Sequence, residues 1–326
     1  MTAQGVNRGQ VVTRFAPSPT GRLHLGHAWS AIRAHDLAAT RSGRFLLRIE
    51  DIDGTRSRPE HVESILADLA WLGLDWEGPV FQSQRLHLYL RALEQLRPWT
   101  YPCFCTRAEI AASLSAPHGP APVYPGTCRR LSPEETAARM AEPHCWRLDM
   151  TRATAAAGSL TWRDETAGEV AADPSPQGDV VLARKDAPAS YHLAVTVDDA
   201  AQGVTDVVRG IDLFEATHVH RLLQALLGLP TPAYRHHLLL AGPDGERLAK
   251  RHGDTRLSSY REQGVPAGRV LELLARWMGL ATGPVHRAAD LLGHFALAKL
   301  PRTPIVFGPD DDRWLRNAAG LPQVRE

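Results

Sequence analysis

The sequence predicts an α/β fold, because short apolar runs typical of buried strands alternate with segments of helical periodicity. Residues 11–13 and 45–49 are compact runs rich in apolar and β-branched side chains, as expected for buried strands. Residues 28–40 and 59–74 place apolar side chains at helical spacing, and each segment ends near a glycine. At 326 residues the chain is long enough for one large domain or two smaller ones.

The composition predicts a soluble protein. Hydrophobic residues make up 44% of the chain, but there is no run of about 18 apolar residues, so we expect no membrane span. The first ten residues are polar and lack the apolar segment of a secretory signal, so we expect a cytoplasmic location. The formal net charge of +1 gives no global indication of nucleic-acid binding, which would need a local basic patch.

Further helices and strands are expected along the rest of the chain. Helical patterns cover residues 85–96, 214–227 and 269–278. Strands are expected over 179–184, 191–199 and 204–210, the last two because they are rich in β-branched residues. Residues 160–177 are polar and rich in Gly, Pro and Asp, so we expect exposed turns there.

One stretch, residues 14–27, joins the first expected strand to the first expected helix and reads Arg-Phe-Ala-Pro-Ser-Pro-Thr-Gly-Arg-Leu-His-Leu-Gly-His. A loop that leads into a helix offers backbone N–H groups and the positive end of the helix dipole, which favour an anion such as phosphate. His24 and His27 would flank that anion. Gly26 would let a planar group lie against the backbone.

The whole fourteen-residue stretch resembles the first signature of class I glutamyl-tRNA synthetases and their short relatives, with His24-Leu25-Gly26-His27 in the place of the HIGH motif. The resemblance implies a Rossmann-like catalytic domain with a parallel sheet, an inserted zinc-bearing subdomain and a short helical C-terminal part. The expected parts are the first half of the catalytic domain at 1–100, the insert at 101–178, the second half at 179–254 and the C-terminal region at 255–326.

Acidic residues follow the expected strand at 45–49, beginning with Glu50. From the residues alone, this is either a ligand site at a sheet edge or a solvated turn. The resemblance implies that Glu50 holds the ammonium group of the substrate amino acid. The positions implied for L-glutamate are Arg14, Phe15, Ala16, Pro17, Ser18, Glu50, Tyr191 and Arg209. A guanidinium can pair a carboxylate bidentately, so Arg14 or Arg209 would distinguish glutamate from glutamine.

The stretch 238–251 reads as a strand, a tight turn and a cationic loop, which by itself indicates only a solvated turn. It resembles the second signature of the family, the KMSKS loop, with Lys250 as the second lysine. Arg247 replaces the first lysine and Ala249 replaces the serine. Since arginine is a wide planar fork, we expect a looser match to pyrophosphate. The resemblance places His24, Gly26, His27, Asp212 and Lys250 at ATP with Mg²⁺, and makes His24, His27 and Lys250 the catalytic donors.

Three of the four cysteines are spaced to hold zinc if one more ligand is supplied. On residue chemistry alone His118 is the favoured fourth ligand, because imidazole binds zinc far more often than a phenol does. The resemblance favours Tyr124 instead. The implied structural zinc site is therefore Cys103, Cys105, Tyr124 and Cys128. The alternative to a zinc site is that these are ordinary reduced cysteines. Cys145 is expected to be a small buried side chain.

Too little chain follows residue 254 for a large helical anticodon-binding region, and we expect none. Short members of the family activate L-glutamate with ATP without tRNA and attach it to the wobble queuosine in the anticodon stem-loop of tRNA(Asp). The resemblance implies this ligase reaction, carried out by a monomer that does not bind membranes. Two alternatives are a truncated glutamyl-tRNA synthetase that charges tRNA(Glu) and a non-catalytic tRNA-binding paralogue, which Arg247 and Ala249 make conceivable.

Overall fold

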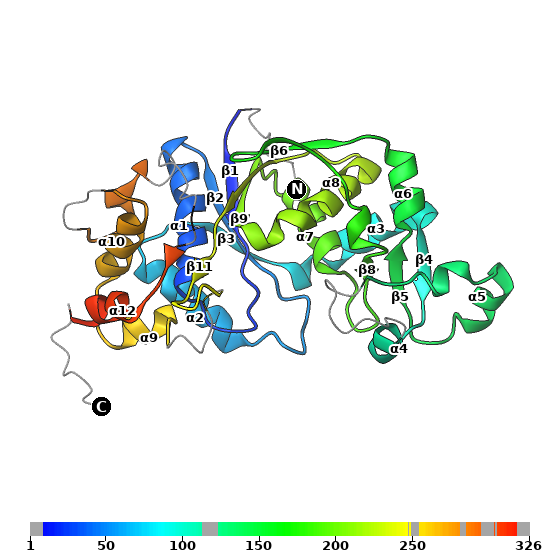
Figure 1. The fold of residues 1–326 in the computed structure, drawn as a ribbon, viewed down its shortest axis with the longest axis horizontal. Coiled ribbons are helices and arrows are strands. Elements are labelled where there is room, and N and C mark those ends of the chain that lie inside the picture. The colour runs from blue at the N-terminus through cyan, green and yellow to red at the C-terminus, as the bar shows by residue number, and fades with distance from the viewer. Residues whose placement is uncertain are drawn as a thin grey trace. The chain divides into compact units, whose positions relative to one another are not determined.

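The structure, a computed structural model, describes residues 9–112, 123–246, 248, 254–280, 285–294, 303 and 305–317. The chain divides into two compact units (Figure 1). Unit 1 comprises Met1–Phe81, Gly203–Asp212 and Ala233–Glu326, and unit 2 comprises Gln82–Gln202 and Leu213–Pro232. Unit 2 is therefore an insertion, made of two pieces of chain, within the sequence of unit 1.

Unit 1 is built on parallel strands. β1 (Val12–Phe15) pairs with β2 (Arg44–Ile49), and β2 pairs with β3 (Glu77–Phe81). β9 (Asp206–Gly210) follows on the other side of β1, where the Thr205 N–H donates to the Val12 carbonyl at 2.9 Å. β10 (Ala233–His237) pairs in parallel with β9. The carboxyl ends of these strands share one edge, which is where open α/β sheets bind ligands.

Helices cover the sheet of unit 1 and close its core. α1 (Leu25–Thr40) packs on β1, β2 and β9. The other described elements of unit 1 are α2 (Pro59–Trp71), β11 (Leu240–Ala241), α9 (Leu257–Glu262), α10 (Ala267–Trp277), β12 (Ile305–Val306) and α12 (Pro309–Arg316). They share one apolar core, in which Trp29, Ile32 and Leu271 are buried. Each side chain of this size stabilises the unit by about 1.5–3 kcal/mol on burial.

Unit 2 contains an antiparallel sheet and a β-hairpin. β5 (Cys145–Leu148) lies between β4 (Thr100–Cys103) and β8 (Val181–Ala183), as Figure 1 shows. β6 (Thr161–Asp164) and β7 (Gly168–Ala171) form the hairpin. The described helices of unit 2 are α3 (Leu86–Gln95), α4 (Arg107–Ala112), α5 (Pro133–Arg139), α6 (Met150–Ala157), α7 (Tyr191–Ala201) and α8 (Phe214–Leu227).

Asp198 ties α7 to the start of α3 inside unit 2. Its carboxylate is fully buried and accepts hydrogen bonds from Arg85 at 2.6 Å, Gln82 at 2.9 Å and the Tyr89 hydroxyl at 2.7 Å. A buried charge of this kind is tolerated because each oxygen is paired.

Two secondary-structure predictions are wrong. Residues 191–199 form helix α7 and no strand, because the Ser190 hydroxyl caps the Leu193 N–H and the apolar side chains are buried on the helix. Packing thus overrides the β-branched composition. Residues 160–177 contain the β6–β7 hairpin, where Trp162 and Asp164 alternate inward along β6. The Asp164 carboxylate accepts the N–H groups of Thr166 and Ala167 in the turn.

The predicted α/β fold and the parallel sheet implied by the resemblance are confirmed. Helices occur at the four later positions where periodicity predicted them, in α2, α3, α8 and α10. α1 begins earlier than expected, at Leu25, so the last three residues of the 14–27 stretch lie in the helix. In the part of the chain that the structure describes, no helix is both long and apolar enough to cross a membrane.

Candidate active site

The two signature histidines cap helix α1. His24 is the N-cap residue, and its Nδ1 accepts the Gly26 N–H at 3.1 Å. The Nδ1 of His27 accepts the His24 N–H at 3.1 Å, and the two ring centroids are 3.8 Å apart. Because each Nδ1 accepts, a neutral ring carries its proton on Nε2. Both imidazoles therefore present an Nε2–H donor at the positive end of the helix dipole.

The His24 ring packs closely against Gly26. A Cβ on Gly26 would lie 3.0 Å from Cε1 and 3.2 Å from Nδ1 of His24. The His24 imidazole thus lies beside the Gly26 backbone and accepts its N–H.

Glu50 is held by an arginine that sequence reasoning missed. Arg48 is fully buried in β2, and its Nη2 lies 3.4 Å from Oε1 of Glu50. The Glu50 backbone N–H donates to the Pro17 carbonyl at 3.0 Å, which joins the end of β2 to the loop after β1. The only sequence signal for Arg48 is a charged residue inside an otherwise apolar strand.

Two buried arginines lie at the carboxyl ends of β1 and β9. Arg14 is 5% exposed, and its Nη1 donates to the Val208 carbonyl at 3.4 Å. Arg209 is also 5% exposed, and its Nε donates to Nε2 of His236 at 3.1 Å. The structure thus brings these two cations to adjacent strands.

Asp212 follows β9 in a short 3₁₀ turn, Ile211–Leu213. A Cβ on Gly210 would lie 2.5 Å from Oδ1 of Asp212 and 2.7 Å from Leu239. The glycine of the Arg-Gly-x-Asp sequence therefore lets the carboxylate fold back onto the end of the strand.

The other predicted site residues lie at the end of β1, in unit 2 or outside the described part of the chain. Phe15 ends β1 and is buried, Ala16 and Pro17 follow it in the loop, and Ser18 is exposed. Tyr191 belongs to unit 2, where it opens α7 and is 38% exposed. Lys250 lies outside the described residues, as do Arg247, Ala249 and His118.

Three cysteines of unit 2 converge to form one cluster. The sulfur atoms of Cys103, Cys105 and Cys128 all lie within 4.8 Å of one another, and those of Cys105 and Cys128 are 3.5 Å apart. The Tyr124 hydroxyl lies 3.7 Å from the Cys105 sulfur and accepts the Cys128 N–H at 2.8 Å. Tetrahedral zinc with bonds of about 2.3 Å sets its sulfur ligands roughly 3.8 Å apart, so the donor set fits.

Cys145 contacts this cluster from the neighbouring strand. It faces Cys103 in the β4–β5 register, and its thiol is hydrogen-bonded to the Cys103 sulfur. This bond is the main reason that the pKa of the Cys103 thiol is lowered to about 4. Burial raises the pKa of the Cys105 thiol to about 11 and raises that of the Tyr124 phenol as well. Cys145 is buried, as the sequence predicted.

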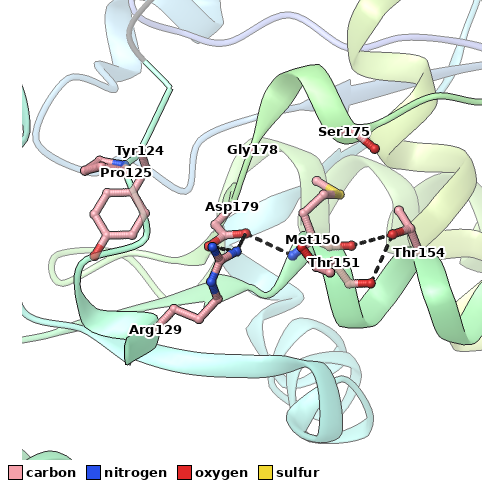
Figure 2. A pocket seen from close by; sticks show the side chains of 9 residues that line it. All are labelled: Tyr124, Pro125, Arg129, Met150, Thr151, Thr154, Ser175, Gly178 and Asp179. Carbon is pink, nitrogen blue, oxygen red and sulfur yellow. Dashed lines mark hydrogen bonds and ion pairs between the residues drawn. The ribbon is translucent and has the colours of Figure 1, made fainter. Parts of the chain in front are cut away.

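Unit 2 also contains a cavity of about 350 Å³ (Figure 2). Its polar lining includes Arg129 and Asp179, joined by an ion pair at 3.0 Å, and the hydroxyl-bearing Thr151 and Thr154. Asp179 also accepts the Met150 N–H at 3.0 Å, as Figure 2 shows. The cation and the carboxylate neutralise each other, so the lining favours neither a cation nor an anion.

The fold is an α/β fold with a parallel sheet. At the carboxyl edge of this sheet, the N-terminus of α1 carries two imidazole donors, an arrangement suited to a phosphate-bearing ligand. The family model of class I tRNA synthetases (E and Q), catalytic domain, matches residues 10–287. The chain belongs to this family.

Two curated relatives share nearly half of their residues with this chain. A glutamyl-Q tRNA(Asp) synthetase of Symbiobacterium thermophilum is 46% identical over 307 residues, which cover 90% of this chain and 94% of the relative. One of Rhodobacter capsulatus is 48% identical over 277 residues, covering 81% and 99%. A crystal structure of a glutamate tRNA ligase from Elizabethkingia meningosepticum, in complex with its amino acid, superimposes with a TM-score of 0.77 at 27% identity and covers 94% of this chain and 68% of that one.

Proposed function

We propose that this protein activates L-glutamate with ATP and transfers the glutamyl group to the queuosine at the wobble position of tRNA(Asp). The observation that carries the proposal is the 46–48% identity to relatives named glutamyl-Q tRNA(Asp) synthetase, which extends over 94% and 99% of those relatives. The two imidazoles at the N-terminus of α1 and the buried arginines of β1 and β9 support the proposal.

In the activation step an oxygen of the glutamate α-carboxylate attacks the α-phosphorus of ATP. A new O–P bond forms, and pyrophosphate leaves with the electron pair of the bond that breaks. Such transfers depend on positioning and on neutralising the charge of the phosphate oxygens. The Nε2–H groups of His24 and His27 would donate to those oxygens, and the N-terminus of α1 would add its dipole. Lys250 and a Mg²⁺ ion that accompanies ATP would add positive charge.

Glutamate would be recognised by charge at both of its ends. Arg209 and Arg14 are buried cations that suit carboxylates, and one of them would reject glutamine, which lacks the side-chain charge. The Glu50 carboxylate, held in place by Arg48, would accept the ammonium group. Phe15, Ala16, Pro17 and Ser18 complete the part of the proposed glutamate site in unit 1, and Gly26 and Asp212 complete the proposed ATP site. A role of Tyr191 in glutamate binding rests on the family resemblance alone.

In the transfer step a hydroxyl of the queuosine cyclopentenediol attacks the carbonyl carbon of the glutamyl adenylate. An ester bond forms and AMP leaves. The acceptor would be the anticodon stem-loop of tRNA(Asp).

The proposal includes one structural zinc ion in unit 2, held by Cys103, Cys105, Tyr124 and Cys128. The support is the mutual approach of the three sulfur atoms and the phenol oxygen within distances that fit tetrahedral zinc. Such an ion would fix the shape of the loop between β4 and β5 and would take no part in the chemistry, since all its ligands come from the protein.

The test is glutamate-dependent exchange of labelled pyrophosphate into ATP, with and without tRNA. We expect exchange without tRNA in the wild type, with glutamate but not with glutamine. We expect Arg209→Ala to abolish exchange and Arg91→Ala, which removes an exposed arginine of α3, to leave it unchanged. Exchange that requires tRNA(Glu) would favour a truncated charging enzyme, and no exchange under any condition would contradict the proposal.

A further inference from the structure

His236 lies directly opposite Arg209 in the sheet of unit 1. The parallel register pairs His236 of β10 with Arg209 of β9, so the two side chains project from the same face. Both are buried, with exposed fractions of 3% and 5%. The contact is therefore set by the strand register and does not depend on a mobile surface loop.

The hydrogen bond between them has only one possible direction. Nε of Arg209 lies 3.1 Å from Nε2 of His236. A guanidinium N–H can donate but cannot accept, so Nε2 of the histidine accepts and carries no proton. A neutral His236 therefore has its proton on Nδ1. A protonated ring would place two N–H donors and two positive charges against each other.

Tyr234 restrains the same guanidinium through its ring face. Cζ of Arg209 lies 5.3 Å from the Tyr234 ring centroid, within the range of a cation–π contact. The Tyr234 and His236 rings are stacked with an interplanar angle of 4° and centroids 5.9 Å apart. The two aromatic side chains, one strand pleat apart, thus fix both the plane and the rotation of the guanidinium.

We propose that His236 is a positioning residue for glutamate recognition: it engages Nε of Arg209 and thereby aims the Nη1 and Nη2 edge at the substrate carboxylate. This inference rests on the proposed role of Arg209 in binding glutamate. A bidentate guanidinium–carboxylate pair needs a defined planar orientation, and an arginine whose guanidinium rotates about the Cδ–Nε bond loses it. His236 acts through Arg209 and does not itself touch the substrate.

The neighbouring residue provides a matched control. His237 is 2% exposed and belongs to the same strand, but its Nε2 contacts the Ser30 hydroxyl of α1 at 2.7 Å. Its Nδ1 lies 3.0 Å from the Leu238 carbonyl, to which it donates. A substitution at this position disturbs the core to a similar extent without removing the hydrogen-bond acceptor of Arg209.

The experiment compares His236→Leu, His236→Gln and His237→Leu. Glutamate binding is measured by calorimetry, and KM for glutamate and for ATP by pyrophosphate exchange. We expect His236→Leu to weaken glutamate binding about ten- to a hundred-fold, the range for losing a hydrogen bond to a charged group. KM for ATP should change less than about two-fold, because the proposed role of Arg209 is to bind glutamate and not ATP. His236→Gln, whose Oε1 can replace Nε2 as acceptor, should restore binding to within a few-fold.

Two results would overturn the proposal. One is equal glutamate affinity in His236→Gln and His236→Leu, and the other is a loss that His237→Leu reproduces. If the wild type binds glutamate but performs no exchange, the proposed function fails while the binding comparison still decides the role of His236. If the wild type binds no glutamate, the proposed function and the proposed role of His236 both fail. Melting temperatures of the three variants show whether a loss reflects unfolding.

Discussion

Acidification should destabilise unit 1 through His237. Burial lowers the pKa of this imidazole from 6.5 to about 3, so the folded protein holds it neutral while the unfolded chain protonates it below pH 6.5. Between pH 6.5 and pH 3 the unfolded state therefore binds more protons than the folded state. The free energy of unfolding is unaffected by this group above pH 6.5 and decreases as the pH falls toward 3. From pH 7 to pH 4 the loss is about 3 kcal/mol, because roughly 2.5 pH units below the unfolded pKa each cost about 1.4 kcal/mol.

The assay is urea denaturation of the wild type and of His237→Gln at pH 7, 5 and 4. Glutamine does not titrate, and its side-chain oxygen can still accept the Ser30 hydroxyl. Groups remote from His237 titrate alike in both proteins, so the difference between the two pH profiles reports His237 together with its coupling to the adjacent His236. We expect the wild type to lose about 3 kcal/mol more than the variant between pH 7 and pH 4. Parallel profiles would refute the reasoning.

Three further predictions concern other parts of the molecule. Cys105→Ser should reduce the zinc content in elemental analysis, whereas Cys145→Ser, a substitution outside the three-cysteine group, should not. If the wild type contains no zinc, the proposed zinc site is wrong. Asp198→Ala should destabilise unit 2 by about 3–5 kcal/mol in chemical denaturation, because the Tyr89 hydroxyl and the Arg85 guanidinium lose their shared acceptor. A change below about 1 kcal/mol would contradict this. Lys250→Ala should raise the activation barrier by about 2–4 kcal/mol in pyrophosphate exchange, the range for losing one charge-stabilising donor, and full exchange in the variant would contradict its assignment.

Much of the sheet of unit 1 could be predicted because local patterns and tertiary packing agree there. In unit 1, β2 is apolar apart from its two arginines, and α2 has one apolar face behind Pro59. In unit 2, α8 ends at Gly228 in the left-handed conformation. The C-x-C spacing predicted that Cys103 and Cys105 lie close together, whereas the approach of Cys128, 23 residues further along the chain, depends on the fold of unit 2.

Other features depend on contacts between distant segments, which a single sequence does not reveal. Val195 and Val197 favour a strand by composition, yet the Ser190 cap and burial place them in α7. The pairing of Arg209 with His236 requires the register of two strands separated by the whole of α8.

The role of Gly26 illustrates the same limit at short range. The sequence indicated room beside its backbone, but not that the ring of the neighbouring His24 would pack there. The pairing of Glu50 with Arg48 likewise depends on the directions that these two side chains take at the carboxyl end of β2.

The most direct test of the account is transfer of labelled glutamate to purified tRNA(Asp) that carries either queuosine or guanosine at the wobble position. The proposed function predicts labelling of the queuosine-containing tRNA(Asp) alone, with the label recovered in the anticodon stem-loop after nuclease digestion. Labelling of tRNA(Glu) at its 3′ end, or equal labelling of both forms of tRNA(Asp), would contradict it.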